Sequence, residues 1–461
     1  MKQGVIEAYQ EDQLVVDLAN LDVVRDALHE RAVVVAGEEH SEQLGLALLT
    51  LADVATVAAE LREDDSEMVR RITGAEPSAA GPDRAEPSDL DLIIFWLRKS
   101  FGSAYAGWVP IIGKNRVVEP VKGLPYVGGG GDGDPYLAGV RDPRRNPRAN
   151  GGLSAGSPGP AAAPPVWPRR AASPGQGVHV GVLDTRLYPN EWLDGAYVAR
   201  EDDLLKVAAP GSRPRPATAG HATFVAGLIL YGAPGAELII RPVLNEQAFG
   251  KAWDVAKDMV SFIGSGVDIL NLSFGCFTDD GKPPLVLARA VSLLSAEILL
   301  VAAAGNHGNV DELRAKGTLV DASWATGLHS NTPMWPAAFS GVTAVGATDG
   351  DNLAPFSPIA PWVDVIAPGV DVESTYLVGE VKLDSPSPQG STTATFSEGF
   401  AYWDGTSFAA AAVSGAVAAK IRPGQHDARQ ALASILASPA NGIHEYHKPG
   451  LVSLAKSSPA T

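Results

Sequence analysis

Short, continuously apolar runs alternate with longer helix-like segments through the second half of the chain. The apolar runs occupy residues 178–184, 237–244, 267–273, 298–303 and 342–347. Runs without a polar face predict strands that are buried on both sides of a sheet. The helix-like segments occupy residues 221–231, 251–263, 285–294, 406–421 and 428–437. This alternation predicts an α/β fold with a doubly wound, mostly parallel sheet that helices cover on both faces.

A different pattern fills the first 130 residues. Strand-like and helix-like segments alternate there, at residues 13–18 (strand), 23–29 (helix), 32–36 (strand) and 42–61 (helix). The first 70 residues contain 5 Lys and Arg against 16 Asp and Glu, so most of the chain's net charge of −17 lies there. We therefore predict a small acidic α+β region over residues 1–130.

Composition separates this region from the α/β pattern. Four successive glycines, Gly128 to Gly131, open a stretch rich in Pro, Arg, Ala and Gly. Such a composition cannot bury enough apolar surface to fold on its own. Residues 131–177 are therefore predicted to be a linker, residues 178–440 the α/β domain, and residues 441–461 a C-terminal tail.

Charge and cysteine content restrict the partners and the compartment. The acidic balance argues against nucleic-acid or anionic-membrane binding, and it suits a basic peptide as substrate or partner. No run approaches the ~18 uninterrupted apolar residues of a membrane-spanning helix. Residues 1–12 are polar and acidic, without the features of a signal peptide. The sole cysteine, Cys276, cannot form an internal disulfide, so we expect a reducing, cytoplasmic location.

Three polar side chains stand at the ends of predicted elements. Asp184 ends the first apolar run, His221 opens a helix of small residues, and Ser407 stands where the helix at 406–421 begins. Parallel strands of open α/β sheets bind ligands beyond their carboxyl ends, and a helix N-terminus favours developing negative charge. Each residue also has a purely structural explanation, as a turn residue, a core or capping histidine, and an N-cap.

Taken together, the three side chains form the set that peptide-bond hydrolysis needs. A serine hydroxyl is a weak nucleophile at neutral pH, so a base must remove its proton during attack. Imidazole suits this task, and a carboxylate would hold it in the required tautomer and stabilise its charged form. The chain order Asp, His, Ser is the order found in subtilisin.

On these motifs, residues 178–421 resemble the subtilisin-like serine proteases. A fourth motif strengthens the resemblance, because the apolar run 299–304 leads through Gly305 to Asn306. In that family the asparagine side chain donates a hydrogen bond to the oxyanion, together with the backbone N–H of the nucleophile. The resemblance therefore implies catalytic roles for Asp184, His221, Ser407 and Asn306, with no cofactor.

The resemblance also implies where a peptide substrate lies. It would add as a strand between two edges, which correspond here to Ala248, Phe249 and Gly250 and to Ser273, Phe274 and Gly275. The walls of the primary pocket would be residues 273–275 and Ala303, Ala304 and Gly305, with Met334 and Ala337 near the floor. A methionine there would shorten the pocket and favour small or medium apolar side chains. Alternatively, Met334 points into the core.

Several positions depart from the family pattern. Ala411 and Ala412 stand where a proline and a histidine are usual after the nucleophile, and Arg186 replaces a glycine near the aspartate. The short turn at 228–236 lacks the loop that holds calcium in secreted subtilisins, so no metal is expected there. Residues 379–402 form an extra segment, predicted to be a hairpin or loop that is either a surface insertion or a substrate-gating flap. The Trp335–Pro336 bond is cis by resemblance, although trans is the general preference.

The resulting hypothesis is a serine endopeptidase, regulated or dedicated to processing. Two alternatives remain open: a peptide ligase or transpeptidase, motivated by Ala411, and a scaffold that binds peptides without cleaving them. Residues 1–130 are either a removable propeptide that blocks the channel or a permanent domain for a regulatory partner. The basic pair Arg169–Arg170 is a candidate processing site, although such pairs are also common in linkers.

Overall fold

The computed structural model describes residues 7–64, 87–120, 174–209, 211–317, 327–383, 393–438 and 442–446. The predicted linker at 131–177, the pair Arg169–Arg170 and most of the tail at 441–461 lie largely or wholly outside these residues, so the domain limits stay predictions. Within the described residues, no helix is both long and apolar enough to cross a membrane.

A largely parallel sheet forms the centre of the larger unit. Its strand order is β20-β15-β13-β12-β10-β5-β8-β6. The strands are β5 (His179–Asp184), β6 (Tyr197–Val198), β8 (Glu237–Pro242), β10 (Ile269–Leu272), β12 (Leu299–Ala303), β13 (Val342–Asp349), β15 (Val365–Pro368) and the antiparallel edge strand β20 (His444–Glu445), with β14 (Asn352–Leu353) paired to β13. Every residue of β10 and of β12 is buried, as expected for a sheet that is covered on both faces.

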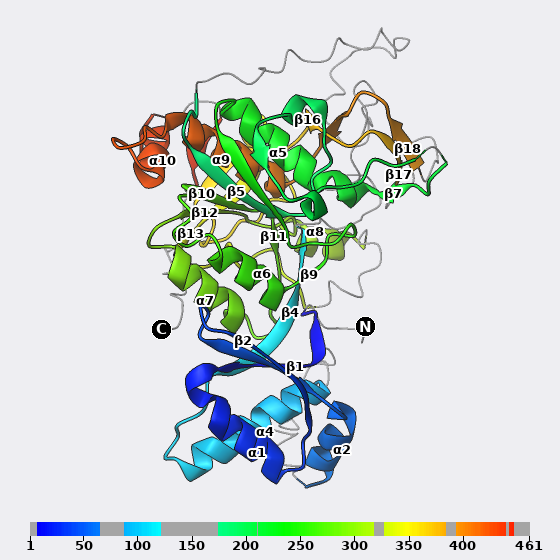
Figure 1. The fold of residues 1–461 in the computed structure, drawn as a ribbon, viewed down its shortest axis with the longest axis vertical. Helices are drawn as coiled ribbons and strands as arrows, with labels where there is room; N and C mark the ends of the chain where they lie inside the picture. The colour runs from blue at the N-terminus through cyan, green and yellow to red at the C-terminus, as the bar shows by residue number, and fades with distance from the viewer. Residues whose placement is uncertain are drawn as a thin grey trace.

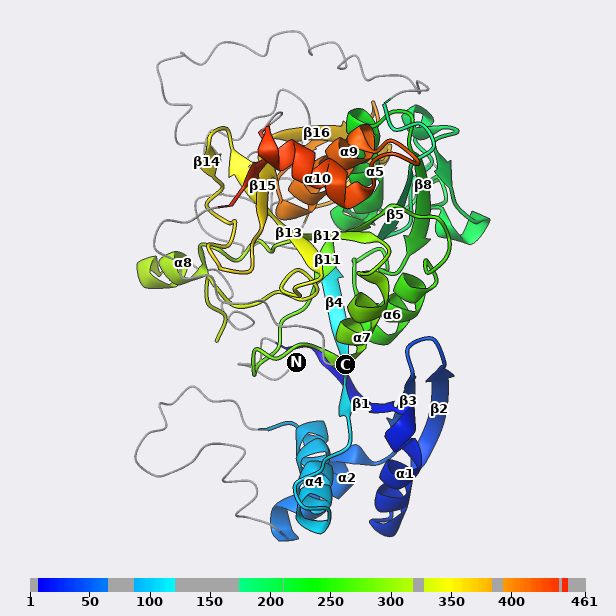
Figure 2. The same cartoon turned by 90° about the vertical axis from the view of Figure 1, so that its left-hand side faces the viewer.

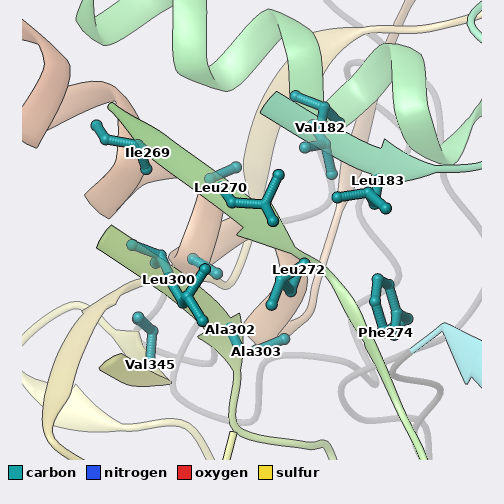
Figure 3. Close-up of a cluster of buried hydrophobic side chains, with 14 of the residues drawn as sticks. Val182, Leu183, Ile269, Leu270, Leu272, Phe274, Leu300, Ala302, Ala303 and Val345 are labelled. Carbon is teal, nitrogen blue, oxygen red and sulfur yellow. The ribbon is translucent and has the colours of Figure 1, made fainter. Parts of the chain in front are cut away.

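Helices lie on both faces of this sheet. On one side are α5 (His221–Gly232), α9 (Thr406–Lys420) and α10 (Ala428–Ala437), and on the other are α6 (Ala252–Val260) and α7 (Leu285–Leu294) (Figures 1 and 2). Figure 3 shows apolar side chains of adjacent strands in this core. Leu270 and Leu300 stand at paired positions and lie on one face of the sheet, whereas Val182 stands one register position further along and lies on the other face. The predicted doubly wound α/β fold is confirmed.

Smaller elements complete this unit. They are the short helix α8 (Val310–Lys316), the strands β7 (Arg215–Pro216), β9 (Gly250–Lys251), β11 (Phe274–Gly275), β16 (Val372–Thr375), β17 (Gly379–Lys382), β18 (Thr393–Phe396) and β19 (Phe400–Trp403), and the 3₁₀ turns at Glu191–Leu193, Glu201–Asp203 and Ala217–Gly220. Strands β17 and β18 pair as a hairpin that also contacts β7, while β16 pairs with β19. The described part of the extra segment predicted at 379–402 thus contains this hairpin and the first residues of β19, which pair with β16 and not with the hairpin. The Trp335–Pro336 peptide bond is cis.

The N-terminal unit has its own sheet and its own core. Its elements are β1 (Tyr9–Asp17), the 3₁₀ turn Leu18–Asn20, α1 (Leu21–Glu30), β2 (Val35–Ser41), β3 (Leu46–Leu51), α2 (Val54–Asp64), α4 (Asp89–Ala104) and β4 (Ile112–Pro120). The antiparallel order is β4-β1-β3-β2. Helices α1, α2 and α4 supply apolar side chains to a second buried cluster against this sheet.

One sequence prediction in this unit is wrong. The helix expected over residues 42–61 is a turn, then the strand β3, and only then the helix α2. Gly45 adopts φ 63° in the turn, and Asp53 adopts φ 52° between strand and helix. These left-handed positions interrupt any continuous helix. Pairing of β3 with both β1 and β2 then fixes it as a central strand.

The two units meet along helices α6 and α7. Arg289 Nη2 lies 2.6 Å from Asp17 Oδ2, and Lys257 forms an ion pair with Glu39. The backbone N–H of Trp253 donates to the buried Asn115 Oδ1 at 2.9 Å. Strand β4 extends beyond the N-terminal sheet into the larger unit (Figure 2).

Candidate active site

Asp184 and His221 are joined by a buried hydrogen bond. Asp184 ends β5 with no exposed surface, and His221 is the first residue of α5. The Nδ1–H of His221 lies 2.8 and 2.9 Å from the two carboxylate oxygens. Because the carboxylate holds Nδ1, the ring is fixed in one orientation, with Nε2 on the side away from Asp184.

Aromatic rings hold the imidazole in place. Trp403 meets the His221 ring edge-on and Phe408 lies tilted against it, each with ring centroids 5.6 Å apart. His221 retains only 3% of its surface exposed. Phe408 directly follows Ser407 in α9, so the imidazole packs beside the residue that neighbours the serine.

Ser407 is the second residue of α9 and belongs to a hydrogen-bonded network beneath the helix. Its hydroxyl donates to the Ser273 carbonyl at 3.4 Å, while the Ser273 hydroxyl donates to the Ser407 carbonyl at 3.2 Å. Asn271 donates to the Ser273 hydroxyl at 2.9 Å and accepts from Ser414 at 3.0 Å. The 3.4 Å between the Ser407 hydroxyl and the Ser273 carbonyl is long for an O–H···O hydrogen bond, so this bond is weak.

Asn306 is oriented by Thr406. Its Oδ1 accepts from both the backbone N–H and the hydroxyl of Thr406, each at 3.0 Å. The Thr406 hydroxyl also accepts from the Gly305 N–H at 3.1 Å. With Oδ1 occupied, the Nδ2 donor lies at the other end of the amide, 3.4 Å from where a Cβ on Gly405 would stand. This places an amide donor beside the start of α9, whose first N–H groups have no helical partner.

The two expected substrate edges are present as short strands, and a strand already lies between them. β9 contains Gly250, preceded by the buried Ala248 and the exposed Phe249, and β11 contains Phe274 and Gly275. Both pair antiparallel with the end of β4. Sequence reasoning did not predict this pairing, since nothing in residues 112–120 indicates their partner.

The residues expected on the walls of the primary pocket stand in or directly beside β11 and at the end of β12. Ala303, Ala304 and Ala337 are fully buried. The Met334 Cε lies 2.6 Å from where a Cβ on Gly275 would stand, and its Sδ lies 2.9 Å from the corresponding point on Gly305. Met334 therefore lies between the two expected walls rather than in a remote part of the core.

His307 is a further buried polar residue that sequence reasoning did not single out, although it directly follows Asn306. Its Nε2–H donates to the Thr332 carbonyl at 2.9 Å. Burial lowers the pKa of His307 to about 4, while the Thr332 carbonyl and Asp311 act in the opposite direction. Its Nδ1 is an acceptor that has no hydrogen-bond partner among the described residues.

Three further positions that the sequence analysis singled out have structural environments that can be described. Burial raises the pKa of the Cys276 thiol to about 12, so it is not an activated nucleophile. Arg186 donates from Nε to the Asp202 carbonyl at 2.9 Å, and Ala411 is buried within α9. Among the described residues, no three His, Cys, Asp or Glu side chains are grouped to hold a metal.

The α/β unit thus carries an aspartate bonded to a histidine at the start of α5, a serine at the start of α9, and an asparagine amide beside that second helix start. The family model of the subtilase family matches residues 175–433. The chain belongs to the subtilase family, the subtilisin-like serine proteases.

Individual relatives agree with this assignment. A thermophilic serine proteinase of Bacillus sp. (strain AK1) is 29% identical over 301 residues, which cover 62% of each chain. Subtilisin Savinase of Lederbergia lenta is 32% identical over 215 residues, 44% of this chain and 67% of that protein. The chain thus spans less than two thirds of the Bacillus proteinase.

One solved structure supports the fold. Fervidolysin from Fervidobacterium pennivorans, a keratinolytic enzyme related to subtilisin, superposes with a TM-score of 0.51. The match covers 93% of this chain and 58% of that one at 16% identity. At this identity the likeness concerns the fold alone.

Proposed function

We propose that the chain is a serine endopeptidase that acts through an acyl-enzyme. The buried hydrogen bond between His221 Nδ1 and Asp184, next to the start of the helix that carries Ser407, is the observation that supports it. The Ser407 Oγ attacks the peptide carbonyl while His221 Nε2 takes its proton. The C–N bond then breaks, and the same proton passes to the leaving amine. Water repeats the sequence and releases the acid.

Two donors would stabilise the developing oxyanion. One is the Asn306 amide, which Thr406 orients through Oδ1, and the other is the backbone N–H of Ser407 in the first turn of α9. Removal of one such donor typically costs about 10²–10³-fold in kcat.

The N-terminal unit would restrain this site in cis. Val117 and Val118 pair with Lys251 and Gly250, while residues 119 and 120 pair with β11. A strand between these two edges uses the hydrogen bonds that an added peptide would need. The Val118 side chain is fully buried, with its Cγ2 near Gly250. We therefore assign β4 as an intramolecular competitor of substrate.

The register also indicates a position for self-cleavage. Pro120 pairs with Phe274, and the residue before Phe274 is Ser273, whose carbonyl accepts the Ser407 hydroxyl. One further step along the chain from Pro120 reaches Val121, which lies outside the described residues. The proposal is that the first cut falls after Val121, not at Arg169–Arg170.

Purified full-length chain tests the activity and the cut together. We expect intact-mass analysis to show a fragment beginning at Lys122 and a fluorophosphonate to label Ser407. Ser407→Ala should abolish both, while Ser397→Ala, on an exposed serine, should change neither. Absence of labelling and of cleavage in the wild type would contradict an endopeptidase. Addition of an amine acceptor separates hydrolysis from peptide transfer by its products.

The restraint is tested by Val118→Asp. A buried carboxylate without a partner would weaken the hold of β4 in the channel. We expect faster turnover of an added peptide, whereas the matched Val23→Asp, on an exposed valine of α1, should leave the rate unchanged. Equal rates for both variants would show that β4 does not compete with substrate.

A further inference from the structure

The structure leaves little room where the side chain next to the scissile carbonyl must go. A peptide on β11 presents that carbonyl near Ser407, because Ser407 bonds to Ser273 at the start of this edge. The walls expected for the primary pocket are at β11 and at the end of β12, so the adjacent side chain would face the space between them. Both sides of this space are glycines, Gly275 and Gly305, which contribute no side chain of their own.

Met334 fills the space between the two glycines. Its Cε and Cγ lie 2.6 and 2.9 Å from where a Cβ on Gly275 would stand, and its Sδ lies 2.9 Å from the same point on Gly305. Real Cβ atoms essentially never approach other atoms this closely, so the methionine touches both walls. Met334 is only 5% exposed.

His307 lies beside Met334 at the Gly305 wall of the same space. Its Nδ1 and Cε1 lie 2.6 and 2.7 Å from the point where a Cβ on Gly305 would stand. The ring cannot easily move away, because Nε2 is bonded to Thr332 and the faces and edges contact two aromatic rings. Phe277 lies edge-on at 4.9 Å, and Trp362 is stacked at 6.4 Å with an interplanar angle of 13°.

We propose that Met334 and His307 together fill the primary pocket, so that the enzyme cleaves after residues with small side chains, up to the size of valine. This proposal rests on the proposed endopeptidase function and names its substrate class. Met334 is the flexible filler and His307 the fixed wall. Each methylene that a pocket cannot accommodate typically changes kcat/KM by ~10–200-fold.

A competition assay tests the pocket in the full-length chain. Peptides that differ only in the residue before the cut, Ala, Val, Leu or Phe, are mixed and their cleavage is followed by mass spectrometry. Ratios of kcat/KM within one mixture do not depend on how much enzyme β4 restrains. We expect the wild type to prefer Ala and Val over Phe by at least ~100-fold.

Variants identify the residues responsible. Met334→Ala should reduce the Ala-over-Phe ratio at least ~10-fold, mainly by a gain for Leu and Phe. Met259→Ala is the matched control, since Met259 is fully buried in α6 and should leave the ratio unchanged. His307→Ala should widen the pocket in the same direction as Met334→Ala.

Each outcome decides the proposal. A wild type that cuts after Phe or Leu as readily as after Ala overturns it without any variant, and so does a Met334→Ala ratio equal to that of Met259→Ala. In both cases the endopeptidase function itself would stand. A wild type that cleaves no peptide and takes no fluorophosphonate would instead overturn the proposed function, and the pocket assignment with it.

Discussion

Neutral His307 should make the stability of this protein sensitive to acid. In the unfolded chain a histidine takes up its proton near pH 6.5, whereas burial lowers the pKa of His307 in the folded chain to about 4. The folded pKa is the lower one, so the unfolded state gains protons first as the pH falls. Stability from this residue is therefore complete above about pH 6.5 and is lost progressively down to about pH 4.

The size of the loss follows from the same two values. A pKa that falls from about 6.5 to about 4 corresponds to roughly 3 kcal/mol in the free energy of unfolding. Among the described residues, Asp311 is the charged group that acts on the ring, and its attraction for a protonated ring is already included in that pKa. His307→Gln removes the titration while it retains a side-chain amide that can donate to the Thr332 carbonyl.

Denaturant unfolding at a series of pH values measures the effect. The protein with His307 is compared with its His307→Gln variant, and both carry Ser407→Ala so that neither can digest itself. The quantity compared is the difference between their free energies of unfolding. Other titrating groups are common to both and cancel. We expect the His307 protein to lose roughly 3 kcal/mol relative to the Gln variant between pH 6.5 and pH 4. A difference that stays constant with pH would refute the reasoning.

Three further predictions follow from buried contacts. The Cys276 thiol, with a pKa raised to about 12, should resist iodoacetamide at pH 8 in the native chain and react after denaturation, and rapid native labelling would contradict its burial. Gly220→Ala should lower stability by ~1–3 kcal/mol and reduce activity, because its Cβ would lie 2.1 Å from the Tyr376 ring; thermal unfolding should show no comparable loss for Gly102→Ala, whose nearest contact is 3.6 Å. Asn271→Ala removes a hydrogen-bond partner from two buried serine hydroxyls. It should lower the free energy of unfolding by ~2 kcal/mol, as measured with denaturant, and should also lower kcat. An unchanged kcat would show that this network does not position Ser407.

The local pattern of apolar and polar residues was enough to predict most of the helices and strands of the larger unit. Helices α7 and α10 have the bounds that their sequence predicts, and the buried strands β5, β8, β10, β12 and β13 follow the apolar runs. Asp184, His221 and Ser407 were identified because each stands at the end of a strongly patterned element. A continuous apolar run has few alternatives to a buried strand, so the residue that follows it has a defined place at the sheet edge.

The hydrophobic pattern did not distinguish a helix from a strand where a segment was short or apolar on both faces. The run at residues 46–51 suits a helix as well as a strand, and only its pairing with β1 and β2 makes it β3. The second half of the same predicted helix, which contains α2, was correct. Periodicity decides between helix and strand only over lengths greater than this run provides.

Tertiary structure decided the contacts between residues far apart in the chain. The insertion of β4 between β9 and β11, the position of Met334 between Gly275 and Gly305, and the burial of His307 depend on which surfaces meet after folding. The residues next to a segment in the sequence do not indicate which distant segment it will contact, because backbone hydrogen bonds between strands are independent of side-chain identity. The sequence by itself therefore determined the chemistry that is available, while the packing of distant segments determined what can reach it.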